Sequence, residues 1–111
     1  MLDALAGQLE RYMDLLSARQ KLVASNIANA DTPGYQTQDI DFQSEFRNAT
    51  RGSPQVQEVA GLATKNDGNN VSLDRESRLL AENALRFSLA SQLMRSQLQQ
   101  VRSAIKEGQG A

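Results

Sequence analysis

The sequence predicts an all-α, elongated fold in which two long terminal helices pair as in a coiled coil and an extended, partly flexible connector joins them. Apolar residues recur at seven-residue intervals toward both ends of the 111-residue chain. Aromatic residues make up only 5% of the chain and tryptophan is absent, so aliphatic side chains must form the interior, which suits helix-on-helix packing. We expect a single elongated unit over residues 1–111, with a helix over 2–30, a connector over 31–71 and a helix over 72–107.

The N-terminal helix is predicted over residues 2–30 because apolar side chains fall on one face of it. Its seven-residue series consists of Leu2, Leu9, Leu16, Val23 and Ala30. Asp3, Glu10 and Asp14 precede Arg19 and Lys21 along it, an order that complements the helix macrodipole.

The C-terminal helix is predicted over residues 72–107, with Ser72 placed to cap it and Gly108 placed to end it. Two seven-residue series run along it: Leu73, Leu80, Phe87, Met94 and Val101, and, four residues on, Ser77, Ala84, Ser91, Leu98 and Ile105. At about 1.5 Å per residue the two helices extend roughly 43 and 50 Å, so the subunit must be rod-shaped.

The connector over residues 31–71 is more acidic than basic. We expect an extended run over 32–41, a short helix over 42–48, and a flexible connector or exposed loop over 51–70, which is rich in glycine and asparagine. Residues 66–70 predict a turn rather than a calcium loop, since the alternating acidic residues and the closing glutamate are missing.

Composition argues against an enzyme and against nucleic acid as a partner. The chain has no histidine and no cysteine, and its net charge is −1. Asp39 and Asp41 alternate at strand spacing, but an extended acidic connector offers no cleft for carboxylate chemistry, so we interpret both as solvated charges. We expect no catalytic residue, cofactor, metal or small-molecule substrate. The first residues lack the pattern of a cleaved signal peptide.

The block from Ser25 to Tyr35 combines a helix end with a specific turn. Pro33 disfavours the helical conformation at Thr32, and Gly34 can take the positive φ of a type II turn, so the helix must stop before Thr32. Asn26 and Asn29 are expected to satisfy backbone groups at the helix end and to hold this turn rather than to bind a ligand.

This block resembles the signature of the flagellar basal-body rod protein family. The matching residues are Ser25, Asn26, Asn29, Thr32, Pro33, Gly34 and Tyr35. The continuation over 39–42 and the segment over 71–76 extend the resemblance to nearly the whole chain, and point to the proximal rod subunits of the B type. The connector is short for that family.

The resemblance implies a structural, non-enzymatic subunit of the proximal rod of the bacterial flagellum. Such a subunit is located in the periplasmic rod of the basal body and is exported without a cleaved signal peptide. Implied partners are further copies of itself, other rod subunits, the adaptor between the MS ring and the rod, and the flagellar type III export gate.

Assembly through the terminal helices would transmit torque and line the export channel. The predicted assembly seam consists of Leu9, Leu16, Val23, Leu80, Phe87, Met94, Leu98 and Val101. Phe42 and Phe46 resemble the short motif by which rod and hook subunits are recognised at the export gate; the alternative is that both rings dock on the helical bundle.

Two other functions remain open on the sequence alone. One is another axial subunit of the rod and hook family. The other is a cytosolic helical adaptor or export chaperone, which would be a stable, fully helical monomer or dimer, whereas a rod subunit would be poorly ordered until it polymerises.

Overall fold

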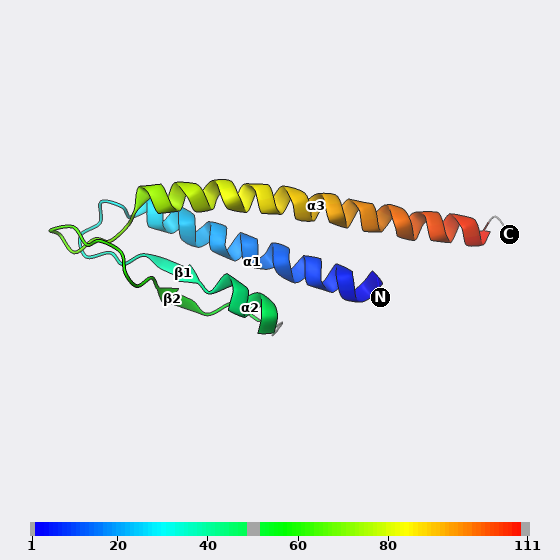
Figure 1. The fold of residues 1–111 in the computed structure, drawn as a ribbon, viewed down its shortest axis with the longest axis horizontal. Coiled ribbons are helices and arrows are strands. Elements are labelled where there is room, and N and C mark those ends of the chain that lie inside the picture. The colour runs from blue at the N-terminus through cyan, green and yellow to red at the C-terminus, as the bar shows by residue number, and fades with distance from the viewer. Residues whose placement is uncertain (1, 49–51, 110–111) are drawn as a thin grey trace.

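The computed structural model describes residues 2–48 and 52–109, and the fold is all-α in its main elements and elongated, as predicted. Its principal-axis extents are 72 × 24 × 17 Å. The two long helices run side by side in opposite directions (Figure 1). In chain order the elements are α1 (Leu2–Ala28), β1 (Gln38–Ile40), α2 (Phe42–Asn48), β2 (Val56–Glu58) and α3 (Leu73–Gln109).

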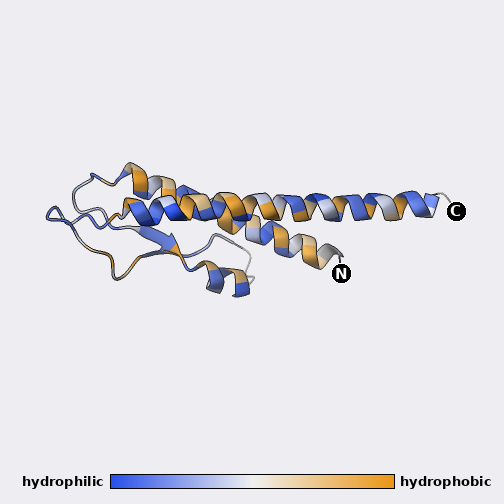
Figure 2. Ribbon diagram, turned by 45° about the horizontal axis from the view of Figure 1, so that its top comes forward, coloured by the Kyte–Doolittle hydropathy of each residue, from blue (hydrophilic) through white to orange (hydrophobic). Residues whose placement is uncertain are grey.

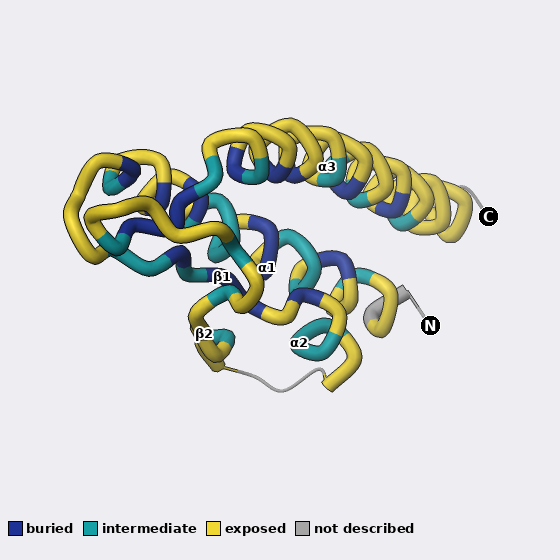
Figure 3. The backbone as a smooth tube through the Cα atoms, turned by 60° about the vertical axis from the view of Figure 1, so that its left-hand side comes forward, coloured by how far each residue is buried: buried dark blue, intermediate teal, exposed yellow. Residues whose placement is uncertain are grey.

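Helix α1 lies in the middle of the molecule. One side of it packs on α3, and another packs on the connector elements β1 and α2 (Figure 3). The core cluster, made of Leu15, Leu16, Ile40 and Phe42, sits where α1 meets this connector. The connector is therefore anchored to the helix pair rather than hanging from its end.

The helix ends follow the predicted signals with one exception. Helix α1 ends two residues before the predicted residue 30. The backbone N–H of Arg75 donates to Ser72 Oγ at 3.2 Å, so Ser72 caps α3 as predicted. The prediction that Gly108 ends the last helix is wrong, because Gly108 lacks the positive φ of a helix terminator and α3 continues to Gln109.

The connector is more ordered than its composition predicted. Helix α2 occupies the predicted range, but the segment predicted as a flexible connector or exposed loop contains β2, which pairs antiparallel with β1. The register places Gln38 opposite Glu58 and Ile40 opposite Val56. All residues of β2 are exposed, so β2 is held in place by its backbone hydrogen bonds to β1. Because β2 has no buried face, its sequence shows no alternation of apolar and polar residues that would predict a strand.

The face of α3 that packs on α1 is not the predicted apolar series. Its buried residues are Glu76, Leu79, Asn83, Ala90 and Gln97. Four of these repeat every seven residues, but they lie three positions after the predicted series that runs through Leu80 and Phe87. Apolar residues recur along all of α3 (Figure 2), so much of its apolar surface stays uncovered in the single chain.

Candidate functional site

The predicted signature lies at the C-terminal end of α1, where the chain turns back toward β1. The backbone N–H of Tyr35 donates to the carbonyl oxygen of Thr32 at 3.2 Å, and Gly34 has φ 75°. This geometry fits the predicted turn, in which proline occupies the second position and glycine the third.

Asn26 ties α1 to the start of β1. Its side chain is fully buried, and its Nδ2 donates to the carbonyl oxygen of Gln38 at 2.9 Å while its Oδ1 accepts the N–H of Gln38 at 3.1 Å. The Tyr35 hydroxyl donates to the same Oδ1 at 3.1 Å. The amide of Asn26 thus pairs with backbone groups of Gln38 in β1, and not with those at the helix end that the sequence analysis predicted.

Asn29 closes the end of the helix. Its Nδ2 donates to the carbonyl oxygen of Ser25 at 2.9 Å, and its Oδ1 accepts the hydroxyl of Thr32 at 3.0 Å. The Ser25 carbonyl oxygen also accepts the backbone N–H of Asn29 at 3.0 Å, so the side chain adds a second hydrogen bond at the last turn of α1. Asn29 holds the turn as predicted.

The sequence did not predict that Asn69 reaches the same helix end from the far side of the connector. Its Nδ2 donates to the carbonyl oxygens of Asn29 and Thr32, both at 2.8 Å, and its Oδ1 accepts the N–H of Val71 at 2.8 Å. Residues 66–70 do form a turn, as predicted, and this turn is a structural partner of the signature.

Asn70, the next residue, bonds to Thr37, which directly precedes β1. Its Oδ1 accepts the backbone N–H of Thr37 at 2.7 Å and the Thr37 hydroxyl at 2.8 Å. A Cβ on Gly68 would lie 3.4 Å from the Cα of Gly34, so the two glycine turns approach closely. We call this whole region the signature junction; it consists of Asn26, Asn29, Thr32, Gly34, Tyr35, Thr37, Gly68, Asn69 and Asn70.

Asp39 joins three elements through charge, and its interpretation as a solvated carboxylate is wrong. The Asp39 side chain is only 9% exposed. Its carboxylate accepts hydrogen bonds from Arg19 Nε at 3.1 Å and from Arg19 Nη2 at 2.9 Å, and it also forms an ion pair with Arg75. Arg75 in turn donates to Glu76 Oε1 at 2.7 Å. Strand β1 carries the aspartate, while α1 and α3 each contribute an arginine, and this meeting of elements is what buries the carboxylate.

Asp41 differs from Asp39 although the two alternate along the chain. Asp41 is exposed, and its Oδ1 accepts the backbone N–H of Ser44 at 3.2 Å, so it caps α2. The two carboxylates therefore hold different elements and do not form a pair.

Phe42 and Phe46 both pack against Tyr12. The ring centroids of Tyr12 and Phe42 lie 5.3 Å apart and those of Tyr12 and Phe46 lie 5.5 Å apart, each in edge-to-face geometry. Phe42 is 6% exposed, and the guanidinium of Arg86 lies 5.6 Å from its ring centroid. Both rings thus dock on the helical bundle, and the export-gate role of this pair stays a prediction.

The predicted assembly seam divides between the two long helices. Its members in α1, Leu9, Leu16 and Val23, are buried within the chain. Its members in α3 are only partly covered: Met94 and Val101 are half-buried, whereas Leu80, Phe87 and Leu98 are 40%, 41% and 51% exposed. We call the exposed apolar line along α3 the outer stripe; it consists of Leu73, Leu80, Phe87, Leu98 and Ile105.

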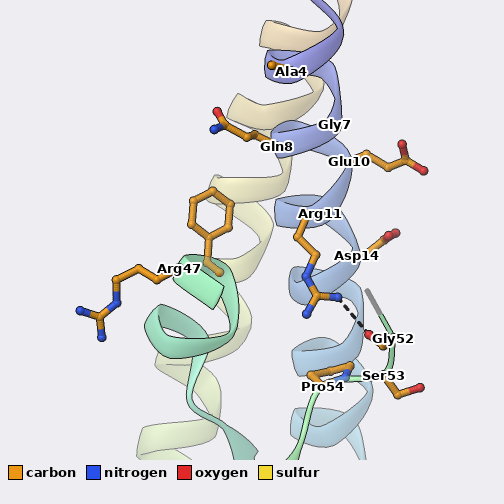
Figure 4. Close-up of a pocket in the computed structure, with 11 residues that line it drawn as sticks. Ala4, Gly7, Gln8, Glu10, Arg11, Asp14, Arg47, Gly52, Ser53 and Pro54 are labelled. Carbon is orange, nitrogen blue, oxygen red and sulfur yellow. Dashed lines mark hydrogen bonds between the residues drawn. The ribbon is translucent and has the colours of Figure 1, made fainter. Parts of the chain in front are cut away.

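An open groove of about 1000 Å³ lies between the start of α1 and the loop before β2 (Figure 4). Arg11 spans it and donates to the carbonyl oxygen of Gly52 at 3.1 Å. Its second contact is an ion pair with Glu45 at 3.5 Å.

Within the described ranges no three acidic, histidine or cysteine side chains are placed to hold a metal ion. Nor does any described helix have the length and apolar character of a membrane span.

An elongated helical hairpin with an uncovered apolar line along its longest helix is typical of a subunit that packs against neighbours in a larger assembly. A family model described as flagella basal body rod protein matches residues 13–36, which include every signature residue. The chain is 33% identical to the flagellar basal body rod protein FlgB of Salmonella typhimurium, over 97% of this chain and 99% of that protein. It belongs to the flagellar basal body rod protein family.

FlgB proteins of other bacteria are similar to this chain as well. FlgB of Escherichia coli is 29% identical over 97% of this chain, and FlgB of Borrelia hermsii is 31% identical over 86%. The alignments with the Salmonella and Escherichia proteins span 137 residues although this chain has 111, so those relatives carry residues that it lacks. That these residues belong to the connector stays a prediction.

Proposed function

We propose that this chain is a structural subunit of the proximal rod of the flagellar basal body, that it self-assembles through its terminal helices, and that the assembled rod transmits torque and lines the export channel. The observation that supports this function best is the outer stripe. A chain that leaves Leu73, Leu98 and Ile105 more than half exposed has apolar surface that a neighbour can cover.

The geometry of the single chain suits a part that carries load. Two long helices in contact along a seam resist sliding through many small contacts, and no single strong bond is required. The signature junction and the Asp39 ion pairs fix the connector to both helices. Torque applied to the connector then passes to the helix pair instead of bending the chain at a loose loop.

Family membership supports the partners and the location that we propose. The partners are further copies of this chain, other rod subunits, the adaptor between the MS ring and the rod, and the type III export gate, and the location is the periplasmic rod. Passage through a narrow export channel requires an unfolded chain. The sequence contains no cysteine, so no disulfide opposes that unfolding.

Substitution of Phe87 by Asp tests the function. A carboxylate on the outer stripe would be buried without a partner in the assembled rod, at a cost of several kcal/mol. Phe87 is 41% exposed in the single chain, so we expect the isolated variant to keep its fold, which circular dichroism of the purified chain checks. We expect non-motile cells that still export the variant but lack it in purified basal bodies.

Ser88→Asp is the matched control, because Ser88 is exposed on the next position of the same helix and off the outer stripe. Cells with this variant should swim. Motile cells carrying Phe87→Asp would contradict the proposed function. A wild-type chain that stays in the cytosol, bound to one partner, would favour the adaptor or chaperone instead.

A further inference from the structure

Helix α3 carries a second uncovered apolar line, which we call the leucine ridge. Leu85, Leu89 and Leu93 follow one another at four-residue spacing and are 63%, 52% and 57% exposed. At 100° per residue Leu89 lies about 160° around the helix from Phe87. The leucine ridge and the outer stripe therefore lie on opposite flanks of α3, on either side of the face that packs on α1.

A groove lies on the flank of α3 that carries the outer stripe. This groove of about 610 Å³ runs between α1 and α3, and we call it the helix-pair groove; its lining residues include Leu16, Ser17, Ala24, Ala84 and Phe87. Ser17, Ala24 and Ala84 are small, so they leave room between the larger apolar side chains. Large branched side chains from a second helix can enter such a groove as knobs enter holes.

The charges at these two surfaces are complementary. Lys21 borders the helix-pair groove and has no hydrogen-bond or ion-pair partner among residues 2–48 and 52–109. Glu82 lies on the line of the leucine ridge, and its one ion pair in the described chain is with Arg86 of the same helix. Asn83 and Lys21 both line the helix-pair groove, and Glu82 is next to Asn83 in the chain. The negative charge on the leucine ridge and the positive charge at the groove therefore lie at the same level along the axis of α3.

We propose that the leucine ridge of one copy of this chain seats in the helix-pair groove of the next copy, with Glu82 facing Lys21. The contact joins two different surfaces on opposite flanks, so it repeats from copy to copy and builds a ring or a helix of parallel subunits instead of closing as a twofold dimer. This inference rests on the proposed function and specifies which faces meet.

Disulfide trapping in purified basal bodies tests the contact, since the natural chain has no cysteine. Leu89→Cys is combined in one chain with Ser17→Cys, Ala24→Cys or Ala84→Cys, and the rods are oxidised. A disulfide needs Cα atoms within about 7 Å, so Leu89 and Ala84, which lie on different flanks of α3, cannot bond within one chain. For the pairs with Ser17 or Ala24 of α1, only products larger than the single chain count as bonds between copies. We expect at least one pair to give a ladder of dimers, trimers and longer products.

The controls are each single cysteine and the pair Gln57→Cys with Ala84→Cys, because Gln57 lies exposed in β2. None of these should give a ladder. Dimers from Leu89→Cys alone would indicate a twofold contact and overturn the inference. Bonds only to a different rod protein, or no bond in any of the three pairs, would overturn it as well.

Charge reversal gives an independent readout of the same contact. Lys21→Glu or Glu82→Lys alone should reduce swimming speed several-fold. The double variant, which restores opposite charges, should recover at least half of the swimming speed lost in the single variants. Absence of that rescue would contradict the pairing. If the chain is present in the rods of motile cells and all these results are negative, only this inference fails; if the chain is absent from basal bodies, the proposed function fails too.

Discussion

Asn69 caps α1 from the far end of the connector: its amide nitrogen lies 2.8 Å from the carbonyl oxygen of Asn29, forty residues earlier in the chain. The same nitrogen lies 2.8 Å from the carbonyl oxygen of Thr32. The signature turn is thus held by a side chain outside the signature. The two ends of the connector are joined at one point, which is also where α3 begins.

Replacement of Asn69 by Asp should destabilise the fold. The new carboxylate cannot donate a hydrogen bond to the two carbonyl oxygens. A carboxylate oxygen buried against two carbonyl oxygens lowers the free energy of unfolding by about 1–3 kcal/mol or more. Denaturant unfolding of the purified chain measures this loss. Asn66→Asp is the control, because Asn66 is exposed in the same turn. Equal effects of the two changes would show that Asn69 does not hold the junction.

Asp39→Asn should cost more than Asp41→Asn. The first change leaves the partly buried arginines Arg19 and Arg75 without their carboxylate, and breaking such a pair costs about 3 kcal/mol. The second keeps a good helix cap, since asparagine caps about as well as aspartate. Thermal unfolding of both variants gives the comparison, and a similar stability loss in the two would contradict the assigned contacts.

The double change Phe42→Ala with Phe46→Ala separates packing from export. If the pair acts at the export gate, the variant accumulates in the cytosol; if the rings only pack, the variant is exported and fails to build a stable rod. Leu15→Ala is the control, because Leu15 is fully buried in the same core cluster but lies outside the motif. We predict export of Leu15→Ala and retention of the double variant. Normal export of both variants would rule out the gate role.

Helix α3 should exchange its amide hydrogens unevenly in dilute solution. Residues 76–90 pack on α1, whereas from Leu98 onward every described side chain except Val101 is exposed. Helical segments without tertiary cover fray readily, so residues 99–109 should exchange much faster. Hydrogen-exchange mass spectrometry tests this expectation. Uniform protection along α3 in a proven monomer would contradict it.

The features that the sequence predicted well are local ones. The seven-residue series of α1, the Ser72 cap, α2 and the turn at Gly34 depend on neighbours within a few residues, so spacing and turn chemistry were enough. The elongated shape followed from the lengths of the two helices.

The features that the sequence did not predict depend on partners far along the chain. Strand β2 exists because it pairs with β1, and Asn69 is buried because α1 ends beside it. The inner face of α3 was missed for the same reason. Glu76 and Asn83 look like surface residues, but Arg75, which donates to Glu76, also pairs with Asp39 of β1, and Asn83 donates to Gln20 of α1 at 3.2 Å.

Cryo-electron microscopy of basal bodies purified from cells that express this chain gives the most direct test of the proposed function. We predict copies of the antiparallel α1–α3 pair in the proximal rod, with Leu80, Phe87 and Leu98 covered by a neighbouring subunit. A complete rod without this chain would contradict the proposed function, and so would a rod in which these three side chains face solvent or the open channel.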